Sequence, residues 1–300
     1  MFLSAPSQLV VHSQRLKDGC AGALHEVEGP QSTVGAHERA KLLERYVATW
    51  PLLKGWMAGI HTAVVKTVSD KQKALGIVGS IGEIGLHHGK FFLSLLLDKA
   101  AEEDAVGIDL FDLQSRNFDK SGRGRQRQVY INAGRVGLNR TKFKLLSSDS
   151  TLLEVHDFQA MNLSAFRLFS IDGGHSYETT LKDLRLARCM LREGGVIVLD
   201  DFINEGWMGV VDAAFHFIRM QTDVRPFLWL CSKLYFTTVG SHKTMLQLIQ
   251  SMPCISCTSS EGLHNSRFTI GSFPLCVARG GCAMSAKESI GSCFKKSMEF

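Results

Sequence analysis

Short apolar runs alternate with amphipathic stretches from about residue 75 to residue 248. The runs are almost purely apolar, as in strands that are buried on both faces of a parallel sheet, and the stretches between them repeat apolar residues at helical spacing. This pattern predicts strands at 76–84, 105–109, 142–147, 168–172, 196–200, 225–230 and 234–238. It predicts helices at 90–101, 129–136, 176–191 and 208–220.

The alternation of strands and helices predicts an α/β fold with a doubly wound, mostly parallel, seven-stranded Rossmann-like sheet. Only Cys231, Ser232 and Lys233 separate the last two strands. A crossover helix needs a much longer connection, so we expect these two strands to pair as an antiparallel hairpin at one edge of the sheet.

The segments that flank this domain, which we place at 74–250, have other patterns. Residues 36–73 predict a helical N-terminal cap that packs on the sheet or forms a homodimer contact, with a lid over the active site as the alternative. Residues 1–35 show no sustained period, so we expect a disordered or poorly defined leader; its weakly apolar start lacks the basic region of a signal peptide. Residues 251–300 are rich in Ser, Gly and Cys, and we assign this tail no role.

The composition is that of an ordinary soluble globular protein, with 45% apolar and 21% charged residues. A formal net charge of +5 permits anionic ligands but does not call for nucleic acid as a partner. No apolar run reaches the roughly 18 to 20 residues that a membrane span needs. We therefore expect a cytoplasmic protein that binds neither membranes nor nucleic acid.

The eight cysteines are unevenly placed, and most of them follow residue 250. Scattered cysteines in a domain of this kind are usually small buried hydrophobic residues, and this is our expectation here. A zinc site is the alternative for Cys254, Cys257, Cys276 and Cys282. The second pair is spaced more widely than a zinc-binding pair normally is, so this pattern is weak.

Three acidic residues follow two of the predicted strands directly. Asp172 ends the strand at 168–172, Asp200 ends the strand at 196–200, and Asp201 follows it. Ligands of open α/β sheets bind beyond the carboxyl ends of the strands, so neighbouring strands would bring these carboxylates together. Like charges in one desolvated site are unfavourable, and a hard divalent cation compensates them most simply.

Signals for an adenosine-bearing cofactor follow the first three strands in order. Glycines at the first strand-to-helix turn allow a ligand to approach the backbone, an acid after the second strand can bind a ribose diol, and polar residues after the third can meet an adenine amino group. These residues are Glu83, Gly85 and Gly89, then Asp109, then Ser148 and Asp149. The glycine spacing differs from the G-x-G-x-x-G that a pyrophosphate favours, and it suits S-adenosylmethionine better.

The stretch from about Leu75 to Leu248 resembles class I S-adenosylmethionine-dependent methyltransferases, and more narrowly the methyltransferase domain 24 family, which includes macrocin-type sugar O-methyltransferases. The motifs that carry the resemblance are Glu83-Ile84-Gly85-Leu86-His87-His88-Gly89, Gly107-Ile108-Asp109, Ile171-Asp172-Gly173-Gly174-His175-Ser176-Tyr177 and Leu199-Asp200-Asp201-Phe202. The resemblance implies that Asp172, Asp200 and Asp201 bind Mg²⁺. It also implies that Glu83, Gly85, Asp109 and Asp149 line the cofactor pocket.

These observations favour a metal-dependent O-methyltransferase that acts on a hydroxyl of a small polar acceptor, such as a sugar or another hydroxylated metabolite. His175 is the first candidate for the general base, because it follows Asp172 by three residues and an imidazole titrates near neutral pH. A metal-bound aspartate such as Asp172 is the alternative base. An NAD(P)-dependent Rossmann oxidoreductase and a non-catalytic binding module with the same fold are the rival functions.

Overall fold

The computed structural model describes residues 19–27, 35–257, 269–270, 273–278 and 281–294. Its centre is an eight-stranded sheet with the order β10-β6-β7-β5-β4-β1-β2-β3. The strands are β1 (Ser80–Ile84), β2 (Ala105–Asp109), β3 (Lys144–Ser147), β4 (Phe166–Ile171), β5 (Leu191–Leu199), β6 (Val224–Leu230), β7 (Lys233–Thr238) and β10 (Cys276–Ala278). A separate short pair joins β8 (Thr269–Ile270) and β9 (Phe273–Pro274).

The predicted α/β class and the mostly parallel sheet are confirmed. Strands β1 to β5 pair in parallel, and β7 pairs antiparallel with both β5 and β6. The seven predicted strands all form, but the sheet has an eighth strand, because β10 from the tail adds in parallel to β6. The hairpin of β6 and β7 is therefore covered by a further strand and does not form the edge of the sheet.

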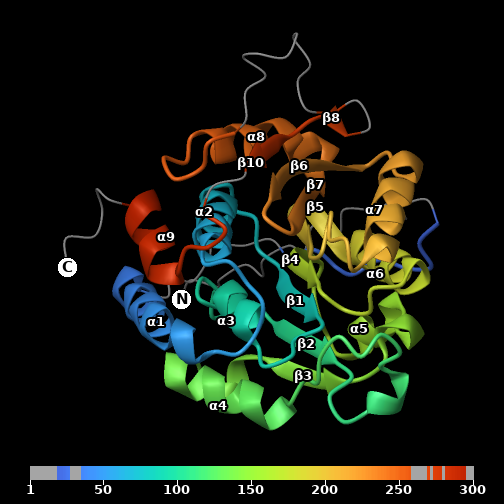
Figure 1. Ribbon diagram of the computed structural model, residues 1–300, viewed down its shortest axis with the longest axis horizontal. Coiled ribbons are helices and arrows are strands. Elements are labelled where there is room, and N and C mark those ends of the chain that lie inside the picture. Colours follow the sequence, from blue (N-terminus) through green and yellow to red (C-terminus); the bar gives the residue numbers. More distant parts are fainter. Residues whose placement is uncertain (1–18, 28–34, 258–268, 271–272, 279–280, 295–300) are drawn as a thin grey trace, which may run out of the picture.

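Helices cover both faces of the sheet (Figure 1). One hydrophobic core lies under α5, α6 and α7, and a second core lies under α1 to α4, α8 and α9. The helices are α1 (Ala36–Thr49), α2 (Ile60–Ala74), α3 (Lys90–Leu96), α4 (Gln126–Val136), α5 (Val155–Ala160), α6 (Tyr177–Met190), α7 (Met208–Met220), α8 (His242–Gln250) and α9 (Ala286–Cys293). None of the helices in the described ranges has the length and apolar character needed to cross a bilayer.

The predicted N-terminal cap packs within the chain. Helix α2 buries much of its surface against α3, α8 and α9, and α1 lies against α4. This agrees with packing on the sheet, whereas the homodimer contact remains a prediction. The connection between the two helices, around Trp56 and Met57, borders the cavity described below.

The C-terminal residues that the structure describes are folded onto the domain. The start of α9 lies against Gly59, where a Cβ atom would stand 2.2 Å from the carbonyl carbon of Ser285. Only glycine permits this contact between backbones. Gly59 N also donates a hydrogen bond to Met284 O at 3.0 Å.

The cysteines do not lie in the structure as free hydrophobic residues, and the zinc alternative is also wrong, because all eight form disulfides. The pairs are Cys20–Cys189, Cys231–Cys282, Cys254–Cys293 and Cys257–Cys276. Three of these bonds join the C-terminal residues to the domain or to one another. The first bond joins the N-terminal residues 19–27 to α6, close to where Leu24 enters the core.

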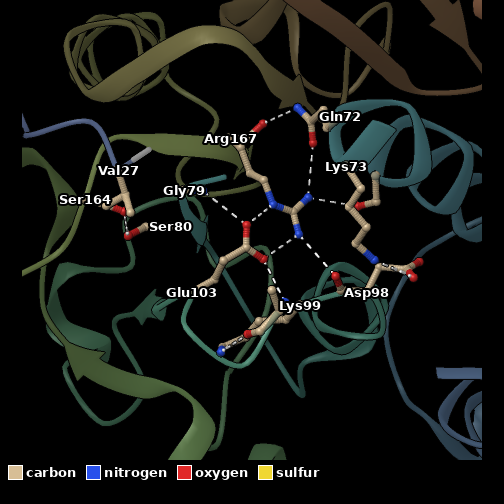
Figure 2. Close-up of polar contacts among 12 residues, drawn as sticks. Val27, Gln72, Lys73, Gly79, Ser80, Asp98, Lys99, Glu103, Ser164 and Arg167 are labelled. Atoms are coloured by element: carbon tan, nitrogen blue, oxygen red, sulfur yellow. Dashed lines mark hydrogen bonds and ion pairs between the residues drawn. The ribbon is translucent and has the colours of Figure 1, made fainter. Parts of the chain in front are cut away.

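A buried ion pair joins β4 to the segment that precedes β2 (Figure 2). The guanidinium of Arg167 contacts the carboxylate of Glu103, and both side chains are almost completely buried. Arg167 also donates hydrogen bonds to Ser69 Oγ and to Gln72 Oε1 on α2, at 3.0 and 3.1 Å. Every charged atom of the pair is therefore compensated, and α2 is fixed to the sheet near the amino end of β4, opposite the site.

Candidate active site

The carboxyl ends of the parallel strands open into a cavity of about 960 Å³. Residues after β1, β2, β3, β4 and β5 contribute to its wall, as expected for an open α/β sheet. Eight of the ten predicted site residues line it: Gly85, Asp109, Ser148, Asp149, Asp172, His175, Asp200 and Asp201. The structure therefore brings most of the predicted site residues to one cavity, and their roles remain predictions.

Potential metal ligands converge in the cavity. Ligand atoms of Asp172, His175 and Asp201 all lie within 4.8 Å of one another. Asp201 adopts a φ of 55°, which turns its side chain away from the direction of the strand. Its Oδ1 accepts a hydrogen bond from Asn204 Nδ2 at 2.7 Å, and its Oδ2 lies 2.9 Å from His175 Nε2. The structure thus brings together two of the three predicted aspartate ligands with the predicted base.

Asp200 lies in the same cluster but is held by other partners. Its Oδ2 forms an ion pair with Lys233 Nζ, and its Oδ1 accepts hydrogen bonds from Ser232 Oγ and Asp201 N. Burial acts to raise the pKa of Asp200, but Lys233 outweighs this effect and holds the pKa below its usual range. Asp200 is therefore a carboxylate that neutralises Lys233.

Lys233 is a site residue that the sequence analysis missed. It is 1% exposed, and its ammonium lies 4.5 Å from the centroid of the Phe91 ring. Burial acts to lower its pKa, but Asp200, Asp172 and Glu83 together raise the pKa above its usual value. The signal for it was its position at the start of a buried strand, where a charged residue needs a compensating partner.

Two acids of the cluster have raised pKa values. Burial and the charge of Asp200 raise the pKa of Asp172 well above its ordinary range. Burial raises the pKa of Glu83 to about 8, against the opposing effect of Lys233. Glu83 Oε1 accepts a hydrogen bond from Ser170 Oγ at 3.0 Å, while Oε2 is buried without a partner among the described residues. When these acids are ionised, the cluster holds more negative charge than Lys233 compensates, and a divalent cation would relieve this excess.

His175 is held between two carboxylates. Its Nδ1 lies 2.7 Å from Asp119 Oδ2, its Nε2 faces Asp201, and its ring stacks on Trp207 with the centroids 4.2 Å apart. Burial acts to lower the pKa of His175, but the hydrogen bonds to Asp201 and Asp119 outweigh it and raise the pKa above 6.5. Asp119 also accepts a hydrogen bond from the backbone N of His175 at 2.9 Å. The imidazole is thus fixed in position and orientation.

Asp119 comes from the loop between β2 and α4, which is rich in basic residues. In the structure the loop lies over the cavity, because Phe118, Asp119, Ser121, Gly122 and Gly124 line its wall. The acid that orients His175 was not found from the sequence, because 56 residues separate the two side chains along the chain.

Gly85 has a role that only glycine can fill. Its φ is +83°, and a Cβ atom would stand 1.7 Å from the carbonyl oxygen of Asp172. The turn after β1 thus passes directly against the turn after β4. Gly89 also has a positive φ, +81°, and begins α3, but it is not among the described residues that line the cavity.

The predicted adenosine-binding residues surround the end of β2. Asp109 accepts backbone hydrogen bonds from His87 N at 2.8 Å and Phe111 N at 2.7 Å, which hold its carboxylate at the cavity. Asp149 accepts from Thr151 N and Thr151 Oγ1 at 3.0 and 2.6 Å. These acids are therefore preorganised by the backbone, as a site for hydrogen-bonding groups of a ligand requires.

Aromatic residues form the outer rim of the cavity. Trp56 is 74% exposed and Phe118 is 84% exposed, although both line the cavity wall. The ring of Trp56 lies 5.1 Å from that of His87, which stacks on His88 at 4.0 Å. Exposed aromatic rings beside a polar centre offer apolar contact to a ligand.

Comparison with known families identifies the domain. Residues 83–202, which contain the acids of the site from Glu83 to Asp201, match the family model Methyltransf_24, described as a methyltransferase domain. This match, together with the sheet order, confirms the predicted resemblance to class I S-adenosylmethionine-dependent methyltransferases. Residues 83–202 therefore resemble a methyltransferase domain, and the activity of the whole chain is a proposal.

Solved structures with a similar fold include O-methyltransferases at low identity. The O-methyltransferase NovP is 14% identical, with a TM-score of 0.49 over 60% of this chain and 79% of that one. CalS11, a TDP-rhamnose 3'-O-methyltransferase of calicheamicin biosynthesis, is 16% identical, with a TM-score of 0.43 over 69% and 82%. An O-methyltransferase from Bacillus cereus in complex with SAH is 14% identical, with a TM-score of 0.44 over 68% and 91%. No curated protein matches the chain significantly.

Proposed function

We propose that the chain is a metal-dependent O-methyltransferase, which moves a methyl group from S-adenosylmethionine to a hydroxyl of a small polar acceptor such as a sugar. The observation that carries the proposal is the convergence of Asp172, His175 and Asp201 beside a cavity that Gly85 and Asp109 also line. Neither a nicotinamide oxidoreductase nor a simple binding module requires this cluster of acids.

The donor set fits a magnesium ion. Asp172 and Asp201 supply carboxylate oxygens, and Mg²⁺ is commonly bound by one or two carboxylates together with water. Both oxygens of Asp200 already accept hydrogen bonds or an ion pair, so we place Asp200 behind the metal as the partner of Lys233. When bound, the ion would lower the pKa of an acceptor hydroxyl and fix its direction.

His175 is the general base that we propose for the acceptor hydroxyl. Its Nε2 faces the acidic cluster, and Asp119 fixes the ring through Nδ1 and favours the proton-bound form. Nε2 would accept the hydroxyl proton when the acceptor oxygen is methylated. S-adenosylmethionine, when bound, would supply the methyl group and leave as S-adenosylhomocysteine.

Binding and turnover are tested separately. We expect isothermal titration to show binding of S-adenosylhomocysteine and no binding of NAD. A methyl-transfer assay on a panel of hydroxylated acceptors should lose its activity when a chelator is added and regain it with Mg²⁺. Binding of NAD in place of S-adenosylhomocysteine would contradict the proposal. Activity that a chelator leaves unchanged would contradict the proposed metal dependence.

Asp172→Asn should reduce kcat by at least about a hundredfold, because it removes a charge that we place at the metal. Its binding of S-adenosylhomocysteine should stay within a few fold. The control is Asp70→Asn, which removes an acid of the same kind from an exposed pair with Lys66 and should leave both quantities unchanged. Full activity of Asp172→Asn would reject the role of Asp172.

A further inference from the structure

The disulfides indicate the compartment in which this chain folds. All eight cysteines are paired, and none is free. Disulfides form and persist in oxidising compartments and are rare in the cytosol, where thiols are kept reduced. The pairs also join segments that are far apart in the sequence, with separations of up to 169 residues. Four such bonds favour an oxidising compartment over the cytoplasm that the sequence led us to expect.

The asparagines of the described residues fall into two groups. Asn117, Asn132 and Asn204 each donate a hydrogen bond from Nδ2 to another residue, and each is buried or half-buried. Asn139 and Asn162 are exposed, and the Nδ2 atom of neither makes a hydrogen bond among the described residues. Asn139 uses only its Oδ1, which accepts from Thr141 N at 3.0 Å.

The two exposed asparagines are also the two that stand in an acceptor sequence for N-glycosylation. The chain reads Asn139-Arg140-Thr141 and Asn162-Leu163-Ser164, which both fit Asn-x-Ser/Thr with x other than proline. Such short matches arise by chance, so the sequences alone carry little weight. Both asparagines are also exposed, and their Nδ2 atoms have no partner among the described residues. The cysteines of the chain are all paired. These observations are independent of the sequence match.

Both asparagines lie away from the active site. Asn139 lies between the end of α4 and the start of β3, and Asn162 lies between the end of α5 and the start of β4. These helix-to-strand connections are at the amino edge of the sheet, whereas the cavity lies beyond the carboxyl ends of the strands. Lys144 Nζ donates to Met161 O at 2.7 Å, so the two connections are neighbours. Sugars at these positions would leave the cavity open.

We propose that this chain is N-glycosylated at Asn139 and Asn162 in an oxidising compartment. The Nδ2 atom bonds to the anomeric carbon of an oligosaccharide carried on a lipid diphosphate, the bond from that carbon to the diphosphate breaks, and Nδ2 releases a proton. The hydroxyl of Ser164 is buried and lies 3.0 Å from Ser80 Oγ in the folded chain. Modification at Asn162 therefore precedes the packing of β4 against β1.

The test uses the full chain, directed into the secretory pathway of a eukaryotic cell, with peptide N-glycosidase as the probe. We expect two sugar chains that the enzyme removes, seen as two steps in electrophoretic mobility. Each deamidated asparagine should be identified by mass spectrometry. Asn139→Gln and Asn162→Gln should each remove one step, and the double variant should remove both.

A matched pair of variants separates modification from folding at Asn139. Thr141→Ser keeps the acceptor sequence and should keep the sugar, whereas Thr141→Ala keeps Asn139 but should lose the sugar. The unreduced chain should take up no thiol-alkylating reagent, as four disulfides require. A secreted chain without removable sugars would overturn the modification. A chain that folds in a reducing cytosol and has reactive thiols would contradict the proposed oxidising compartment.

This proposal does not rest on methyl transfer. We expect the enzymatically deglycosylated protein to retain methyl transfer within about twofold, because both sites are remote from the cavity. An inactive protein that carries both sugars would reject the proposed function alone, and an active protein without them would reject only the modification.

Discussion

Asp183 and Gly85 show how single residues are constrained behind the site. Asp183 on α6 is completely buried, and its Oδ2 accepts a hydrogen bond from Ser150 Oγ at 3.2 Å, while Oδ1 has no partner among the described residues. Burial raises the pKa of Asp183 to about 7. Gly85 fixes the distance between two turns, since any side chain there would meet Asp172. Asp183 is constrained by the cost of burying its charge, and Gly85 is constrained by the lack of space for a side chain.

The raised pKa of Asp183 predicts a pH dependence of stability. Below the unfolded pKa, near 4, both states are protonated and Asp183 has no effect. As the pH rises towards 7 the folded state binds more protons than the unfolded state, so stability falls, by an upper bound on the order of 4 kcal/mol, and then levels off above pH 7.

Asp183→Asn should remove this contribution, because an amide does not titrate. Urea unfolding from pH 4 to pH 8 measures it. We expect the variant to gain stability relative to the parent as the pH rises, and the exposed Asp70→Asn to run parallel to the parent. Identical pH profiles for Asp183→Asn and the parent would show that Asp183 titrates normally.

The C-terminal residues act as an element that completes the domain. β10 adds to the sheet beside β6, α9 packs on α2, and Cys282 is joined to Cys231 in the turn between β6 and β7. Both of these cysteines line the cavity. Since Ser232 and Lys233 follow Cys231 directly and hold Asp200, the disulfide fixes the turn that positions the acidic cluster.

Replacing Cys231 and Cys282 together by serine should lower the free energy of unfolding by about 4 kcal/mol, the chain-entropy value for a loop of 51 residues. It should also change the KM for the acceptor several-fold, because the turn beside the cavity is released. The matched control replaces Cys20 and Cys189, whose disulfide is not in the cavity wall. That pair should lose stability while keeping KM, and an equal change in KM for both would refute a local role.

At the scale of the whole molecule, the cavity collects residues from five strands and from a loop that closes over them. No single half of the sheet contains the site. A ligand that binds there contacts connections from both sides of β1, so its binding free energy adds to the free energy of unfolding of the whole domain.

S-adenosylhomocysteine at about one hundred times its Kd should therefore stabilise the protein by about 2.7 kcal/mol, measured by urea unfolding. NAD at the same concentration should give no increase. Asp109→Ala should lose most of the ligand-induced increase, because Asp109 lines the cavity, whereas Asp112→Ala should retain it, since Asp112 is almost fully exposed. An undiminished increase in Asp109→Ala would place the ligand elsewhere.

Elements with a local hydrophobic pattern could be predicted well from the sequence. Met208–Met220 was predicted as a helix with these bounds, and Ala105–Asp109 as a strand with these bounds. Ser176 begins the helix predicted at 176–191, and in the structure its Oγ caps α6 by accepting a hydrogen bond from Thr179 N. Bounds were wrong where a buried apolar run continues beyond a strand, as before Ser80, because apolar character does not mark where pairing begins.

The sequence by itself determined the α/β alternation and the acids at the strand ends, because strand and helix periods and strand termini are local properties of the chain. Only the tertiary structure decided which residues meet there: that Lys233 holds Asp200, that Asp119 orients His175, and that every cysteine has a partner. These contacts join residues tens of positions apart. Their existence depends on the packing of whole elements, which no local pattern encodes.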